Sequence, residues 1–156
     1  MTTKMNNDFF NTAPDCEIVT IRVLQAARET VFRAWTDPAI LRRWWGPAGF
    51  TNTFHEFNPV PGGKWKFMMH GPEKGNYPNE CIFLAVDAPS LIAWDRISQP
   101  HFRVVTTFEE VPGDKTTLTF RMQFSSKEAC DKLRPFVVGK NEENFDKLEV
   151  ELAKML

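Results

Sequence analysis

Polar side chains that could converge in one site lie in the middle of the sequence, on or beside segments with strand-like alternation. They are His55, Glu56, His70, Glu80, Asp95, Arg96 and His101. An acid and a base that converge in one cavity could perform proton-transfer chemistry, and His70, Glu80, Asp95 and His101 are the candidate polar groups of such a pocket. A single histidine beside a turn is more often an ordinary surface residue, so both interpretations stay open.

Motifs of the common catalytic centres are missing from the sequence. It contains no phosphate-binding glycine loop, no G-x-S-x-G, no H-E-x-x-H and no cysteine with a neighbouring histidine. Its three cysteines, Cys16, Cys81 and Cys130, are odd in number and far apart, which predicts free thiols. We therefore expect no metal site and no cofactor, and the sequence favours a binding protein over an enzyme.

Aromatic side chains are the more unusual feature, because the chain has 14 Phe and 5 Trp but a single Tyr. Side chains alternate along a strand, so positions 64–70 place three large apolar residues on one face. The predicted ligand-binding residues are Trp44, Trp45, Trp65, Phe67, Met69, Tyr77, Phe108, Phe124 and Phe145. Together they could line a concave site of about 300–1,000 Å³. Ordinary core packing is the alternative for each of them.

Composition argues against several other roles. The net charge is −1 and the 19 basic residues are scattered, so the chain has no electropositive stretch for nucleic acid. No apolar run approaches the ~20 residues that span a bilayer. The N-terminus also lacks the basic start and apolar stretch of a signal peptide. We expect a cytoplasmic protein that does not act on membranes.

Local patterns predict how these residues are positioned. Residues 17–24 alternate and are rich in β-branched side chains, as in a half-buried strand, and a short helix is expected at 28–36. Asp37 followed by Pro38 opens a second helix, which ends at Gly46-Pro47. Six further strands are expected at residues 50–57, 64–70, 80–86, 91–96, 102–110 and 116–124. The short turns between them favour antiparallel pairing.

The C-terminal part returns to a helical pattern. Residues 127–134 form a first segment that is interrupted at Pro135, and a longer helix runs from about residue 140 to 156. Phe145, Leu148 and Leu152 form its apolar stripe and should pack on the sheet. The prediction is therefore an α+β domain over residues 16–156, preceded by a flexible arm at 1–15. Its seven-stranded curved antiparallel sheet wraps around the long C-terminal helix, with two short helices after the first strand.

Several motifs in this order resemble a known family. They are Trp44-Trp45-Gly46-Pro47, Pro61-Gly62-Gly63-Lys64-Trp65-Lys66-Phe67, Met69-His70-Gly71-Pro72, Tyr77-Pro78-Asn79-Glu80 and Pro100-His101-Phe102-Arg103. The chain is similar to the START and polyketide-cyclase superfamily, in the branch related to the 90-kDa heat-shock-protein ATPase activator. Asn144-Phe145 stands where many relatives carry Gly-Trp, which leaves a smaller aromatic side chain at that end of the pocket.

The resemblance implies a helix-grip fold with a cavity between sheet and C-terminal helix that binds apolar molecules in various members. Our leading hypothesis is that this chain binds an apolar or aromatic small molecule. One alternative is a chaperone-associated protein that resembles the ATPase activator, with the chaperone as its partner. Another is an enzyme of the polyketide cyclase or aromatase kind. Monomer and homodimer both stay open.

Overall fold

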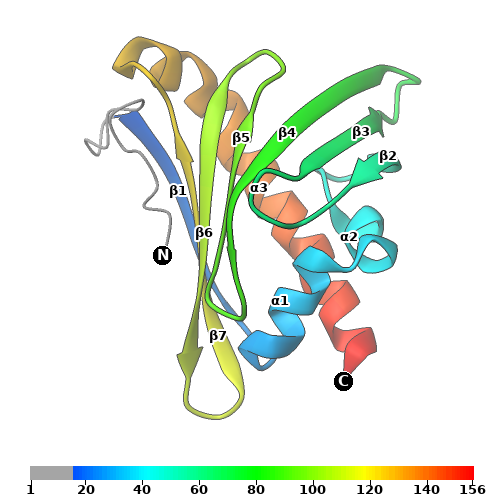
Figure 1. Cartoon of the computed structure of the whole chain (residues 1–156), viewed down its shortest axis with the longest axis vertical. Coiled ribbons are helices and arrows are strands. Elements are labelled where there is room, and N and C mark those ends of the chain that lie inside the picture. The colour runs from blue at the N-terminus through cyan, green and yellow to red at the C-terminus, as the bar shows by residue number, and fades with distance from the viewer. Residues whose placement is uncertain (1–15) are drawn as a thin grey trace.

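The computed structural model describes residues 16–156, which form one antiparallel sheet with three helices on one side of it (Figure 1). The strands are β1 (Glu17–Leu24), β2 (Thr51–Phe57), β3 (Lys64–His70), β4 (Asn76–Asp87), β5 (Leu91–Arg96), β6 (Phe102–Val111) and β7 (Lys115–Gln123). The helices are α1 (Arg28–Thr36), α2 (Pro38–Trp44) and α3 (Lys127–Met155). The predicted α+β architecture and its seven strands are confirmed. The predicted arm, residues 1–15, lies outside the described residues.

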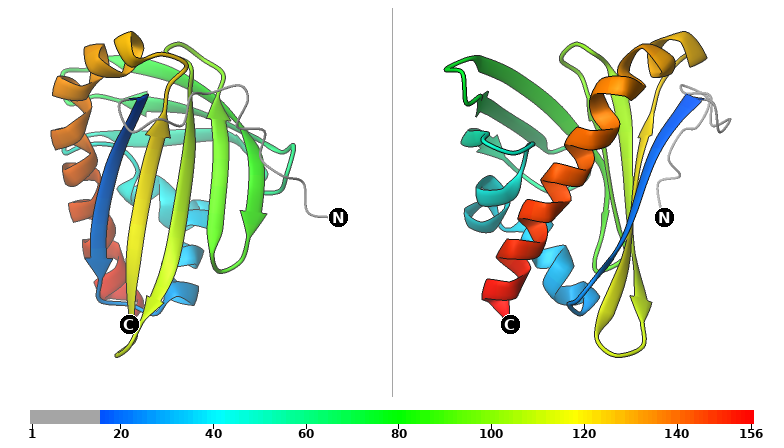
Figure 2. Two further views of the ribbon diagram at one scale, coloured as in Figure 1. Left: turned by 90° about the vertical axis from the view of Figure 1, so that its left-hand side faces the viewer. Right: turned by 180° about the vertical axis from the view of Figure 1, so that it is seen from behind.

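The sheet is a meander that returns to its first strand. Its order is β1-β7-β6-β5-β4-β3-β2, so β1 pairs with the last strand, with Glu17 opposite Gln123. Figure 2 shows that the sheet curves and that α3 runs diagonally along its concave side, with α1 and α2 beside it. Every neighbouring pair is antiparallel, as the short connections predicted.

The two short helices begin where the sequence predicts. Asp37 caps α2, and its side-chain oxygen accepts a hydrogen bond from the backbone N–H of Ala39 at 3.0 Å. Pro38 occupies the first turn, where its missing N–H is not needed. Both helices bury one face, and Trp35 of α1 and Trp44 of α2 are almost fully enclosed. This pair of tryptophans fixes α1 against α2.

The predicted interruption at Pro135 is wrong, because α3 is one continuous helix of 29 residues. A proline removes a single backbone hydrogen bond from a helix and crowds the preceding turn. Here Pro135 is exposed, while Cys130 before it and Asn141 after it are buried and hold both halves on the sheet. Figure 1 shows the first turns of α3 at an angle to the remainder, which is how a helix accommodates a proline.

Ion pairs fasten α3 to the first strand. Arg22 of β1 contacts the carboxylates of Glu142, Asp146 and Glu149 on α3, at 2.6, 2.7 and 2.8 Å. These three carboxylates hold the pKa of the Arg22 guanidinium above its usual range, against the lowering effect of partial burial. Beneath them the predicted stripe of Phe145, Leu148 and Leu152 is buried against the core.

Strand β4 begins four residues before the predicted Glu80, at Asn76. The reason is that residues 76–80 pair with β3 alone, since β5 joins β4 only from Cys81 onwards. Pro78 therefore sits on an edge, where its lack of an N–H costs no ladder bond on the open side. Within residues 16–156, no helix is long and apolar enough to cross a membrane.

Candidate functional site

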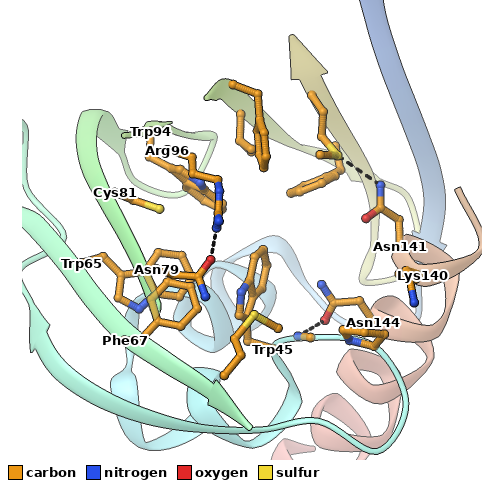
Figure 3. Close-up of a pocket in the computed structure, with 17 residues that line it drawn as sticks. Trp45, Trp65, Phe67, Asn79, Cys81, Trp94, Arg96, Lys140, Asn141 and Asn144 are labelled. Atoms are coloured by element: carbon orange, nitrogen blue, oxygen red, sulfur yellow. Dashed lines mark hydrogen bonds between the residues drawn. The ribbon is translucent and has the colours of Figure 1, made fainter. Parts of the chain in front are cut away.

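A cavity of about 160 Å³ lies between α3 and the middle of the sheet, and it is partly open to solvent. Its apolar walls are Trp45, Pro47, Trp65, Phe67, Met69, Trp94, Phe102, Val104, Phe120 and Met122. Its polar and small residues are Gly46, Asn79, Cys81, Arg96, Lys140, Asn141 and Asn144. Figure 3 shows the sheet residues on one side and the three α3 residues on the other.

Strand β3 builds the aromatic wall by simple alternation. Trp65, Phe67 and Met69 lie on one face, as their spacing predicted, and all three line the cavity. The Trp65 and Phe67 rings are stacked with their centroids 4.4 Å apart, and Trp45 meets Trp65 edge to face at 5.2 Å. These rings bury much of their surface against one another. The cavity is consequently smaller than the predicted 300 Å³ lower limit.

Arg96 brings a positive charge to the sheet side of the cavity. Its guanidinium donates to the carbonyl oxygens of Pro100 and Gln99, at 3.1 and 2.9 Å, and to the side-chain oxygen of Asn79. The group also lies over the Phe102 ring, 5.7 Å from its centroid. Burial lowers the pKa of Arg96, because a charge loses hydration there. All three acceptors are neutral.

Cys81 lies beside Arg96 in the sheet, directly opposite it across the β4–β5 ladder. Burial raises the pKa of the Cys81 thiol to about 12, and the nearby Arg96 charge offsets this only in part. The thiol is therefore protonated at neutral pH and acts as a small apolar wall. None of the cysteines within residues 16–156 forms a disulfide.

Helix α3 closes the other side with asparagines and a lysine. Asn141 and Asn144 are both buried, one turn apart on the face that meets the sheet. The amide of Asn141 reaches the Met122 sulfur at 3.4 Å, and the side-chain oxygen of Asn144 accepts from the Gly46 N–H at 3.0 Å. Lys140 is exposed at the edge of the cavity. The helix thus offers short polar groups where the sheet offers rings.

The loop after α2 is fastened to α3 at the cavity edge. The Lys147 ammonium donates to the carbonyl oxygens of Gly46, Pro47 and Phe50, at 3.3, 3.3 and 3.1 Å. Partial burial lowers the pKa of Lys147. Gly46 has φ +98°, and a Cβ on it would lie 2.8 Å from the Met69 methyl group, so this position requires glycine. The loop therefore forms a fixed edge.

The structure separates the predicted apolar site residues into three groups. The first group lines the cavity and consists of Trp45, Trp65, Phe67 and Met69. Tyr77 pairs with Met69 and shares its face of the sheet, but it lies outside the cavity and is 53% exposed. Its ring lies 6.0 Å from that of Phe50. The remaining predicted residues fill the core outside the cavity. These are Trp44, Phe108, Phe124 and Phe145.

The predicted polar groups lie outside the cavity. Glu80 and Asp95 each follow or precede a lining residue along their strand, so alternation sends them to the opposite face. There Asp95 forms an ion pair with Arg103 at 3.0 Å. His70 is likewise on the outer face, 2.8 Å from both Thr53 and Asn76. His101 precedes β6 and is not a lining residue.

Sequence reasoning missed most of the polar lining, although two patterns could have located it. Asn79 and Cys81 pair with Phe67 and Trp65 across the β3–β4 ladder, so the hairpin register places them on the same face. On α3, Asn141 lies four residues before Phe145 and therefore shares its buried stripe. Arg96 was among the candidate polar residues but not among the four predicted polar groups of the pocket. In the described part of the chain, no three His, Cys, Asp or Glu side chains cluster as metal ligands would.

A family of proteins matches most of this chain. The family model described as "Activator of Hsp90 ATPase homolog 1-like protein" matches residues 25–153. Among curated proteins, none matches the sequence.

Solved structures share the fold over nearly their full length. A protein from Nitrosomonas europaea has a TM-score of 0.84 at 19% identity, covering 91% of this chain and 97% of its own. One from Staphylococcus epidermidis has a TM-score of 0.78 at 26% identity, with 90% and 92% covered. An AHSA1 protein from Silicibacter pomeroyi has a TM-score of 0.73 at 21% identity, with 90% and 99% covered.

Proposed function

Because the chain belongs to the family of Activator of Hsp90 ATPase homolog 1-like proteins, a branch of the START-like superfamily, we propose that it binds a small apolar or aromatic molecule between its sheet and α3. The observation that carries this proposal is the cavity of about 160 Å³ with aromatic walls. A close-packed core has no void of this size.

The cavity volume limits the ligand. An apolar cavity of roughly 150 Å³ is known to admit benzene, so a single substituted ring fits without rearrangement. The rings of Trp45 and Trp65 meet edge to face here, and both side chains contribute to the lining. A ligand of this size therefore contacts indole groups, whose resonances and fluorescence report on binding.

Titration with a neutral single-ring probe, benzamide, tests the proposal by the shifts of the tryptophan indole N–H resonances. Met69→Ala alters the wall and should change benzamide affinity by about threefold or more, with little effect on the unfolding midpoint. Met155→Ala is the matched control, because Met155 is equally half-buried against the core but outside the cavity. The proposal fails if native protein binds neither benzamide nor its carboxylate counterpart benzoate, or if both variants change probe affinity equally.

The family match favours a second candidate, contact with the 90-kDa heat-shock protein. Addition of this chain to the purified chaperone should then raise its ATPase rate, and a heat-inactivated sample serves as the control. An unchanged rate would remove this candidate. No observation favours the cyclase alternative, because His70, Glu80, Asp95 and His101 lie outside the cavity.

A further inference from the structure

Arg96 has no acidic partner within residues 16–156. Its hydrogen bonds go to two backbone carbonyls and one amide oxygen, and no carboxylate lies within ion-pair distance. The neighbouring carboxylate on its strand, Asp95, is on the other face and is paired with Arg103. The half-buried guanidinium of Arg96 loses part of its hydration, and this loss lowers its pKa. Such charges are normally compensated by an anion.

Arg96 also retains unused donors. A guanidinium has five N–H groups, and the three hydrogen bonds of Arg96 use its Nε–H and one N–H on each terminal nitrogen. One N–H therefore remains on each terminal nitrogen of Arg96, which is itself a lining residue of the cavity. Paired donors on a planar group suit the two oxygens of a carboxylate.

The helix side of the cavity adds further donors without adding an acid. Lys140 lines the cavity and forms no ion pair with any described residue. The amide nitrogen of Asn144 is also available, because only its oxygen is engaged, by Gly46. None of the 17 lining residues is Asp or Glu. The cavity is thus electropositive in a chain whose net charge is −1.

We propose that the ligand is a small carboxylate with an aromatic or branched apolar body, held by Arg96 from the sheet and Lys140 from α3, with its body against Trp45, Trp65 and Phe67. This inference rests on the proposed function and specifies its ligand class. The two cations lie on opposite sides of the cavity (Figure 3). A carboxylate between them supplies the counter-ion that residues 16–156 do not provide there, while the ring contacts the aromatic wall.

Benzoate and benzamide form a matched pair of probes, because they are nearly isosteric and differ in charge. We expect wild-type protein to bind benzoate about tenfold more tightly than benzamide, as two or more charge-assisted hydrogen bonds would provide. Added salt should weaken benzoate binding and leave benzamide unchanged. Isothermal titration at two salt concentrations measures both effects.

Two variants locate the charge that is responsible. Arg96→Gln should lower benzoate affinity to that of benzamide, and Lys140→Gln should lower it by about two- to threefold. Arg42→Gln and Lys132→Gln make the same charge changes outside the cavity and should leave benzoate binding within about twofold. Should Arg96→Gln not fold, Arg96→Lys keeps the charge, loses the paired donors and should give an intermediate affinity.

The outcomes separate this inference from the proposed function. Equal binding of benzoate and benzamide by wild-type protein would overturn the carboxylate proposal and leave a neutral-ligand cavity. Binding of neither probe would overturn both. Benzoate binding that the control variants weaken as much as the cavity variants do would assign the effect to overall charge, and the carboxylate proposal would again be wrong.

Discussion

The concave side of the sheet has two ends built from the same kinds of residue. At one end, the closed end, Trp35 contacts Trp44, Phe108 and Phe145, with ring centroids 4.9, 5.7 and 6.1 Å apart. At the other, the cavity end, Trp65 and Phe67 face Asn141 and Asn144 of α3 across open volume. Both ends are rich in aromatic side chains, yet only one is filled.

What differs is the element that faces the rings. Helix α1 inserts Trp35 into the closed end, whereas α3 presents short amides to the cavity end. An aromatic ring packs against another ring, whereas the short side chain of an asparagine leaves the space in front of a ring unfilled. Aromatic content therefore does not distinguish a pocket from a core. The side chains opposite the rings decide it.

The variant with the largest expected effect on the free energy of unfolding tests whether the two ends differ in packing. Leu148→Ala removes a fully buried side chain next in the α3 stripe to Phe145 and should lower the free energy of unfolding by about 2–5 kcal/mol. Met69→Ala at the cavity end should lower it by about 1 kcal/mol or less, because its neighbours already border open volume. Denaturant unfolding measures both. Equal losses would break the comparison.

A pH experiment sharpens the description of the cavity end. Burial raises the Cys81 pKa to about 12, above the value of about 8.5 of an unfolded thiol. The protonated thiol therefore contributes to the free energy of unfolding below about pH 8.5, and this contribution is lost as the pH rises toward the folded-state pKa of about 12. The loss should be about 2 kcal/mol at pH 10.

The matched variant isolates this thiol from the other titrating groups. Cys81→Ala should flatten the fall of unfolding free energy between pH 8 and 10, measured in reducing buffer. Cys16 and Cys130 are present in both proteins, so the difference between the two pH profiles belongs to Cys81. Identical pH profiles of wild-type protein and Cys81→Ala would mean that water reaches the thiol freely and that the cavity end is open around it.

The smallest expected effect concerns the fixed edge of the cavity. Asn144→Ala removes the acceptor of the buried Gly46 N–H and should cost about 1 kcal/mol. Glu143→Ala removes the acceptor of the Ala48 N–H, which is exposed, and should cost less than about 0.5 kcal/mol. Hydrogen exchange at Gly46 should accelerate in the first variant only. Acceleration in both would show a loop that moves as a unit.

Local rules were sufficient for most of the fold. Alternation located the β3 wall, and Asp37 with Pro38 located the start of α2. They failed at Pro135, because a missing hydrogen bond was outweighed by packing on both sides of it. The polar half of the site was also missed, since its members come together only through the β3–β4 register and the path of α3 across the sheet. Neither is encoded in any short stretch.

The pairing of β1 with β7 also has a consequence for how the chain folds as it leaves the ribosome. Glu17 and Gln123 are separated by 106 positions yet are joined by a side-chain hydrogen bond. The first strand is therefore synthesised long before β7, with which it pairs, and Arg22 is synthesised earlier still relative to the carboxylates of α3. Such non-local pairing slows folding, because the entropy cost of closing the long loop comes before the contacts that offset it. The cavity is completed only after α3 has been synthesised, because Lys140, Asn141 and Asn144 form one side of it.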